Sequence, residues 1–214
     1  MISRRVAAVL GAMVGLVLLA SCTSPPDQFD RAGAERYGLQ GSMLGDALDK
    51  PDVVFTDTEG QPYDLRTETA SELTLVFFGY TSCPDVCPIH LDRISSAFER
   101  AQLEGGVPNM VFVGVDTARD TPEQLRTYLD RFDDRFVGLT ATPEEIDRAM
   151  AQLQLPGAVI PDDTSGNYTV GHPSQVVVFT PDDKAHIVYP FGATEQVWVE
   201  DLPQLETIEW ESIT

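Results

Sequence analysis

An unbroken apolar run of eight residues, Leu73 to Tyr80, places the strongest constraint on the fold of this chain. The run reads LTLVFFGY, and its β-branched and aromatic residues suit a strand that is buried on both faces. Two similar runs follow, at Met110 to Asp116 and at Gln175 to Thr180. Such strands need helices against the sheet to bury them. The sequence therefore predicts an α/β domain with a central mixed β-sheet flanked by helices.

Apolar spacing and capping signals predict the helices between these strands. One helix runs to about Leu103 and has its apolar residues on a single face: Cys87, Leu91, Ile94 and Phe98. Two more begin at Thr121 and Thr142, each followed by a proline and, at the third helical position, by Gln or Glu, as in a capping box. A short helix is expected near residues 196–205. Residues 185–189 follow a turn sequence, which indicates a hairpin with the preceding strand.

The N-terminus has the features of an exported protein. Arg4 and Arg5 precede the uncharged stretch Val6 to Ala20, which is short for a membrane span. Leu19 to Cys22 resembles a bacterial lipobox, in which the signal is removed and the cysteine carries lipid. The alternative is an uncleaved anchor with an incidental cysteine. We therefore predict a signal peptide over residues 1–21, a membrane-proximal tether over 22–45 as an N-terminal extension, and a folded domain over 46–214.

The charge of the chain limits its partners. The 34 acidic residues outnumber the 14 basic ones and give a formal charge of −20. Such a surface argues against nucleic acid as a partner and is typical of a solvated face outside the cell. With Cys22 lipidated, the protein is expected on the extracytoplasmic face of the cell membrane, where disulfides are allowed.

Cys83 and Cys87 form the chemical motif of the domain. They follow the strongest strand directly and open the next helix, so their spacing is expected to place both sulfurs on one helix face. A helix N-terminus also favours thiolates. Three residues separate the cysteines, against two in a thioredoxin-type redox pair. This difference favours a soft metal such as Cu(I) or zinc over a disulfide, while a local structural disulfide remains the alternative.

A histidine would complete such a metal site. His172 precedes the strand at Gln175 to Thr180 and is the leading candidate. His90 lies near the cysteine face but is about 10 Å along a helix from Cys83, too far to share one ion easily. A site with no histidine ligand is the third possibility. His186 lies inside the hairpin and is most simply a surface or packing residue.

The segment Phe78 to Pro88, which reads FGYTSCPDVCP, resembles the signature of the Sco/SenC family of copper-binding assembly proteins. The segment Val115 to Pro122 and the position of His172 before Pro181 are similar to further blocks of that family. The resemblance implies a thioredoxin-like fold. It also implies that Cys83, Cys87 and His172 bind Cu(I) or Cu(II), and that Asp116, with Asp85 between the cysteines, lies in the outer sphere.

The same resemblance implies a function and its alternatives. Family members help to assemble the dinuclear copper centre of cytochrome c oxidase, so the expected partner is the copper-accepting subunit of that enzyme. They act by delivering copper or by reducing the subunit's cysteines. The sequence therefore fits both a metallochaperone and a thiol-disulfide oxidoreductase. The metallochaperone, which is not an enzyme, is the favoured hypothesis. A thiol peroxidase needs a Thr and Arg environment around its reactive cysteine, and this sequence shows none. Nothing in the chain specifies a redox sensor, and a monomer is expected.

Two residues depart from the family pattern, and one candidate has a simpler role. Thr117 stands where a proline often follows the aspartate, and Pro173 stands where a small hydroxyl residue is usual. A proline restricts the residue before it, so Pro173 would be either an ordinary trans proline or a cis proline facing the cysteines, with His172 extended. Asp116 could equally pair with Arg119 or cap a turn.

Overall fold

The structure is a computed structural model that describes residues 29–162 and 167–210. The strands are β1 (Phe29–Asp30), β2 (Ser42–Asp49), β3 (Val54–Asp57), β4 (Pro62–Asp64), β5 (Thr74–Gly79), β6 (Asn109–Gly114), β7 (Val137–Thr140), β8 (Val176–Phe179) and β9 (Lys184–Tyr189). The helices are α1 (Arg31–Arg36), α2 (Leu65–Glu68), α3 (Val86–Arg100), α4 (Pro122–Leu129), α5 (Pro143–Gln152) and α6 (Glu195–Thr207). The described strands form one sheet in the order β1-β2-β9-β8-β5-β6-β7-β3-β4.

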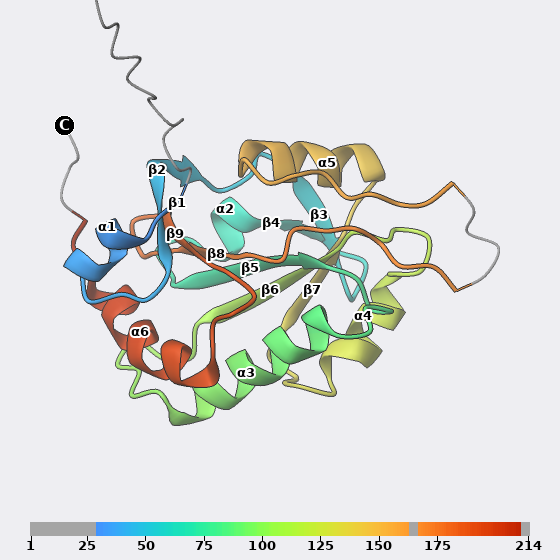
Figure 1. Cartoon of the computed structure of the whole chain (residues 1–214). Coiled ribbons are helices and arrows are strands. Elements are labelled where there is room, and N and C mark those ends of the chain that lie inside the picture. Colours follow the sequence, from blue (N-terminus) through green and yellow to red (C-terminus); the bar gives the residue numbers. More distant parts are fainter. Residues whose placement is uncertain (1–28, 163–166, 211–214) are drawn as a thin grey trace, which may run out of the picture.

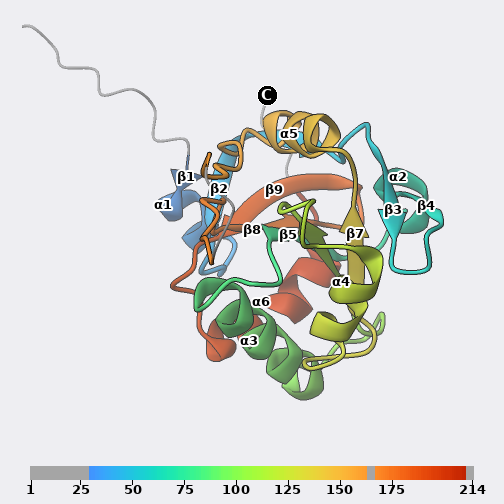
Figure 2. The ribbon, with the colours of Figure 1, turned by 90° about the vertical axis from the view of Figure 1, so that its right-hand side faces the viewer.

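The sheet is mixed and is covered by helices on both faces. Strands β5, β6 and β7 run parallel, whereas β8 pairs antiparallel with β5. Helix α5 lies over one face, and α3 and α6 lie over the other (Figures 1 and 2). Every residue of β5 is buried, as expected for the run Leu73 to Tyr80. The predicted α/β class with a central mixed sheet is confirmed.

Capping explains where two of the helices begin. The Thr142 hydroxyl accepts from the backbone N–H of Glu145 at 3.3 Å, and the Glu145 carboxylate accepts from the Thr142 N–H at 3.0 Å. This is the predicted capping box of α5. At α4 the Thr121 hydroxyl accepts from the Gln124 N–H at 3.3 Å, and within the described residues the return bond of a full box is found only at α5. The sequence around Thr121 therefore predicts the start of α4 correctly, but the capping box expected there is only a single hydrogen bond from the Gln124 N–H to Thr121.

The strand register brings three chain segments to one edge of the sheet. Gly79 and Gly114 are paired at the carboxyl ends of β5 and β6. Phe77 pairs with Val176 at the start of antiparallel β8. The residues that follow β5 and β6 and those that precede β8 therefore meet at this edge. It lies at the right-hand end of the sheet in Figure 1, and Figure 2 looks onto it.

The folded domain begins before the predicted boundary at residue 46. Residues 29–45 were expected in a tether, but they form β1, α1 and the start of β2. β2 pairs antiparallel with β9, with Met43 opposite Ile187. Leu39 and Met43 are buried there although the segment has no sustained apolar period, because β2 lies in the sheet between β1 and β9. Residues 23–28 of the predicted tether, Cys22 and the predicted signal peptide lie outside the described residues.

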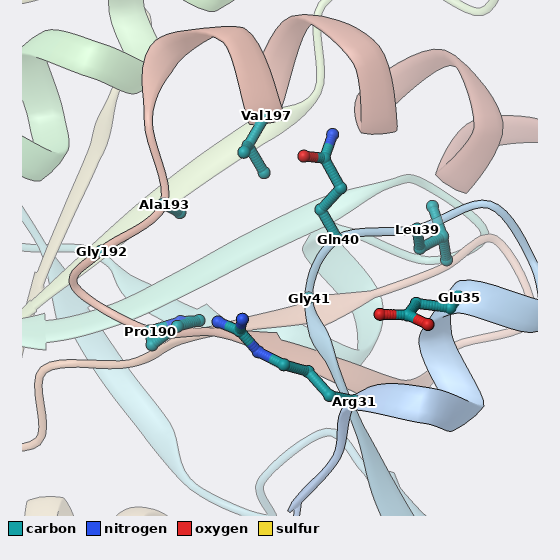
Figure 3. A pocket seen from close by; sticks show the side chains of 9 residues that line it. All are labelled: Arg31, Glu35, Leu39, Gln40, Gly41, Pro190, Gly192, Ala193 and Val197. Atoms are coloured by element: carbon teal, nitrogen blue, oxygen red, sulfur yellow. The ribbon is translucent and has the colours of Figure 1, made fainter.

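A cavity of about 280 Å³ lies where this N-terminal segment meets the chain between β9 and α6. Figure 3 shows Arg31 of α1 extending toward Pro190 on the opposite wall. No cysteine or histidine is among the described residues that line the cavity. The metal-binding chemistry predicted from the sequence therefore belongs to another part of the domain. Within the described residues, no helix is long and apolar enough to cross a membrane.

Candidate metal centre

The cysteine motif lies in the turn that joins β5 to α3. The Cys83 N–H donates to the Tyr80 carbonyl at 3.1 Å, which closes a turn directly after the strand. Helix α3 begins at Val86, with Asp85 as its N-cap. The expectation that both cysteines lie on one helix face is therefore wrong. Cys83 precedes the helix because the non-helical backbone of Asp85 separates it from the first turn.

The two sulfurs nevertheless lie close together. The Cys83 sulfur accepts a hydrogen bond from the backbone N–H of Cys87 at 3.3 Å. It thus satisfies an N–H of the first helical turn that would otherwise lack an intrahelical partner. Cys87 is fully buried under the sheet edge, whereas Cys83 is 8% exposed. Both are free thiols within the described part of the chain.

His172 brings a third donor to the same point. Its Nε2 lies 3.6 Å from the Cys87 sulfur and 3.9 Å from the Cys83 sulfur. All three ligand atoms lie within 4.8 Å of one another. Ligand atoms held about 2.0 to 2.3 Å from an ion are roughly 3.3 to 4 Å apart in trigonal or tetrahedral geometry. The three side chains could therefore surround one ion with little rearrangement, and two sulfurs with an imidazole suit a thiophilic metal.

The environment drives the pKa values of the two thiols apart. The hydrogen bond with the Cys87 side chain is the main cause that lowers the pKa of Cys83 to about 4, and His172 and the Cys87 backbone N–H add to it. Burial raises the pKa of Cys87 well above its usual range, and the neighbouring Cys83 sulfur raises it further. Cys83 is therefore the thiolate of the pair, and it is also the more accessible sulfur.

A second hydrogen bond fixes the orientation of His172. Its Nδ1–H donates to the carbonyl oxygens of Phe78 and Pro173, each at 2.9 Å. Burial opposes protonation of the ring, but the Cys83 sulfur and these carbonyls outweigh it and raise the pKa of His172. Described peptide bonds are all trans, so the cis alternative for Pro173 is wrong. With Pro173 trans, the Pro173 carbonyl accepts from Nδ1 of His172, and Nε2 of the same ring faces both sulfurs.

The structure does not bring the other histidines into this group. His90 is buried in α3, donates from Nε2 to the Ser174 carbonyl at 3.0 Å, and packs between Phe77 and Phe191. Burial lowers the pKa of His90 to about 4, so the ring is neutral. His186 contacts Asp182 at 2.7 Å and stacks on Trp210, a packing role as expected.

The predicted outer-sphere carboxylates occupy different environments. Asp116 is fully buried directly after β6, pairs with Arg119, and accepts from the Tyr168 hydroxyl at 2.9 Å. The simpler interpretation of Asp116 as the partner of Arg119 thus describes an observed contact. Asp85 is exposed and accepts from the Val86 N–H at 2.7 Å as a helix cap. An outer-sphere role for either carboxylate remains a proposal.

Sequence reasoning missed Asp120, Thr81 and Tyr168. The buried Asp120 carboxylate accepts from the Thr81 N–H at 2.9 Å, from the Thr81 hydroxyl at 2.7 Å and from the Asp116 N–H at 3.0 Å. It therefore ties the cysteine turn to the segment that follows β6. Burial raises the pKa of Asp120 to about 6 despite these hydrogen bonds. Asp120 lies within the segment Val115 to Pro122 that resembles the family, but that resemblance assigned it no role. Its position directly before the N-cap Thr121 indicates only a helix start.

The described fold and this cluster define an α/β domain of thioredoxin-like type, with a two-cysteine, one-histidine candidate metal centre at the carboxyl edge of its parallel strands. Comparison with known families identifies it further: the SCO1/SenC family matches residues 45–206. The chain belongs to this family.

Individual relatives agree with this assignment. Protein SenC of Rhodobacter capsulatus is 35% identical over 153 residues, which cover 67% of this chain and 63% of SenC. The structure of Bradyrhizobium japonicum ScoI with copper bound is 30% identical, has a TM-score of 0.63, and the match covers 74% of this chain and 99% of that one. Apo Sco1 from Thermus thermophilus is 29% identical with a TM-score of 0.65, covering 78% and 96%. These similarities confirm the predicted thioredoxin-like fold and the Sco/SenC resemblance.

Proposed function

We propose that this protein carries one copper ion through Cys83, Cys87 and His172 and supplies it to the copper-accepting subunit of cytochrome c oxidase. The observation that carries the proposal is the convergence of two sulfurs and one imidazole nitrogen within 4.8 Å at one sheet edge. Copper is the cargo here, and a soft, three-donor site suits Cu(I). The proposal includes an extracytoplasmic position with a lipid anchor on Cys22, in keeping with the leader sequence.

The geometry suggests how the cargo is held and released. Cys87 is fully buried and forms the floor of the site, whereas Cys83 and the half-buried His172 form its outer side. An acceptor thiolate can reach the ion from that outer side and replace these ligands one at a time. The helix start at α3 and its backbone N–H on the Cys83 sulfur stabilise the thiolate while the ion is absent.

Copper titration of the reduced protein tests the proposal. Competition with a chromophoric Cu(I) chelator should show one tightly held ion. His172→Ala should weaken binding, and Cys83→Ser or Cys87→Ser should weaken it more because each removes a thiolate. His186→Ala is the matched control and should bind as the parent does. A parent that binds no copper, or an unchanged affinity and spectrum in His172→Ala, would overturn the three-ligand site.

A second candidate function is thiol-disulfide exchange with the acceptor subunit, favoured by the low pKa of Cys83. The Cys83 thiolate would attack an acceptor disulfide, form a mixed disulfide and release one acceptor thiolate. Cys87, losing its proton, would then attack the Cys83 sulfur and release the second thiolate. The products are a reduced acceptor and a Cys83–Cys87 disulfide, a two-electron transfer.

Two measurements distinguish these functions. An exchange catalyst should have a reduction potential well above that of an inert structural disulfide, and its activity should survive His172→Ala. In a strain that lacks the gene, added copper should restore cytochrome oxidase activity if delivery is the main role. Failure of copper to restore activity would favour thiol reduction.

A further inference from the structure

Tyr168, four residues before His172, is attached to the segment that follows β6. Its hydroxyl donates to Oδ1 of Asp116 at 2.9 Å, and that carboxylate is fully buried. The contact joins residues 52 positions apart in the sequence. It therefore connects the chain that carries His172 to an element on the opposite side of β5.

Arg119 completes the attachment. Its Nε donates to the other carboxylate oxygen of Asp116. Both of its terminal nitrogens donate to the Tyr168 carbonyl at 3.3 Å, and its guanidinium carbon lies 3.6 Å from the centroid of the Tyr168 ring. Tyr168 is thus held at its hydroxyl, its ring and its backbone. We call Asp116, Arg119 and Tyr168 the latch.

The latch continues to the metal centre through Tyr80. The Arg119 guanidinium lies 5.8 Å from the Tyr80 ring centroid, and the Tyr80 ring packs edge-on against His172 at 5.5 Å. On its other side, Asp116 is joined through its backbone N–H to Asp120, which holds Thr81 beside the cysteine turn. The segment that follows β6 therefore contacts both the histidine-bearing chain and the cysteine-bearing turn.

His172 benefits from such support because the chain before it is attached at few other points. Val170 is buried, and its backbone is hydrogen-bonded by the Tyr80 side chain. Residues 167, 169 and 171 are exposed, and β8 begins only at Val176. In the described part of this segment, backbone pairing is limited to Gly171 with Val159, at 2.8 and 2.9 Å. A ligand on a loosely attached chain must be ordered when the ion binds, which weakens binding.

We propose that Tyr168 and Arg119 are positioning residues for copper binding, which hold His172 where its Nε2 faces the two cysteine sulfurs. The inference rests on the proposed copper site, and it assigns to Asp116 the role of anchoring both residues. Neither Tyr168 nor Arg119 contacts the ion; they act through His172.

Tyr168→Phe removes only the hydroxyl that reaches Asp116. We expect Cu(I) affinity to fall about threefold to tenfold, the range for one lost hydrogen bond. In the Cu(II) form, the nitrogen hyperfine coupling from His172 should weaken or become heterogeneous. Arg119→Lys keeps the charge but loses the planar stacking and the paired donors, and it should act in the same direction.

Tyr189→Phe is the matched control, because Tyr189 also donates to a buried aspartate, Asp201, at 2.6 Å. This variant should lower the thermal unfolding temperature at least as much as Tyr168→Phe does, while its copper affinity stays at the parent value. A loss of copper affinity in Tyr189→Phe equal to that in Tyr168→Phe would overturn the inference, since general destabilisation would then explain both.

A double variant separates positioning from any other contribution. If Tyr168 acts through His172, then adding Tyr168→Phe to His172→Ala should leave the copper affinity of His172→Ala unchanged. An additional loss in that background, or parent-like binding and spectra in both Tyr168→Phe and Arg119→Lys, would overturn the latch. The copper-site proposal itself fails if the parent binds no copper or if His172→Ala binds as the parent does, so the two outcomes are distinguishable.

Discussion

The Nδ1 atom of His172 lies 2.9 Å from the carbonyl oxygen of Phe78. The strand that leads into the cysteine turn therefore also orients the third donor. Because a carbonyl can only accept, Nδ1 carries the proton and Nε2 is directed at the two sulfurs. Strand β5 thus positions the cysteine turn, which follows it, and orients His172 through the Phe78 carbonyl.

This arrangement predicts opposite tautomers for two histidines of the reduced, metal-free protein. Above the raised pKa of His172, its imidazole should carry the proton on Nδ1. His90 should carry its proton on Nε2, since that atom donates to the Ser174 carbonyl at 3.0 Å. Nitrogen–proton correlation spectra of the imidazole rings distinguish the two forms. An Nε2–H tautomer at His172 would contradict the proposed ligand geometry.

Position 79, the last residue of β5, must be glycine because the buried Cys87 sulfur leaves no room for a side chain. A Cβ at this position would lie 2.8 Å from the Cys87 sulfur and 2.7 Å from Cε2 of Phe112. Gly79→Ala should therefore destabilise the fold by about 1–3 kcal/mol through overpacking, and should also weaken copper binding. Gly45→Ala in β2 is the control, because a Cβ added there would have no heavy atom within 4 Å outside its immediate chain neighbours. Chemical denaturation and copper titration measure both effects, and equal behaviour of the two variants would contradict the prediction.

The sequence predicted the centre of the domain better than its edges. The run Leu73 to Tyr80 is continuous, apolar and rich in β-branched and aromatic residues, so it predicts a strand buried on both faces. Strands β3, β4 and β7 have only three or four residues each, and their partial burial leaves no clear alternation. The N-terminal strand β2 was missed for a related reason, because its apolar residues are few and its pairing with β9 is set by tertiary contacts.

The candidate site shows the same limit at the level of single residues. Cysteine and histidine are rare in this chain, so their spacing indicates chemistry directly. Asp120 and Tyr168 are common residue types, and their importance comes from hydrogen bonds to residues 39 and 52 positions away. No local pattern encodes such contacts. The exact start of α3 was also missed, because Asp85 caps the helix and so places Cys83 before it.

The two cysteines should differ sharply in reactivity toward iodoacetamide. Cys83 has a pKa lowered to about 4, so it is already a thiolate at pH 6 and its alkylation rate should change little up to pH 8. An ordinary thiol would react roughly tenfold faster for each pH unit over this range. Cys87 is fully buried with a raised pKa and should remain unlabelled in the folded protein. Peptide mass spectrometry after quenching identifies the labelled residue, and preferential labelling of Cys87 would contradict this assignment.

Ionisation of Asp120 should lower the free energy of unfolding as pH rises from about 4 to 6. Burial raises its pKa from 3.8 to about 6, so the folded state binds a proton that the unfolded state has already released in this range. The free energy of unfolding should therefore fall with rising pH, by about 3 kcal/mol from this group alone. The contribution is obtained by subtracting the stability of Asp120→Asn from that of the parent at each pH.

Asp133→Asn provides a control of opposite sign. Hydrogen bonds with Arg135 lower the pKa of Asp133, so this group contributes stability that is present above its unfolded pKa and is lost as pH falls. The parent-minus-variant difference should therefore decline with rising pH for Asp120 and increase with rising pH for Asp133. A flat difference for Asp120 would mean that its bonds to Thr81 and Asp116 fully compensate for burial. The carboxylate between the cysteine turn and the latch would then titrate near the ordinary aspartate value of 3.8.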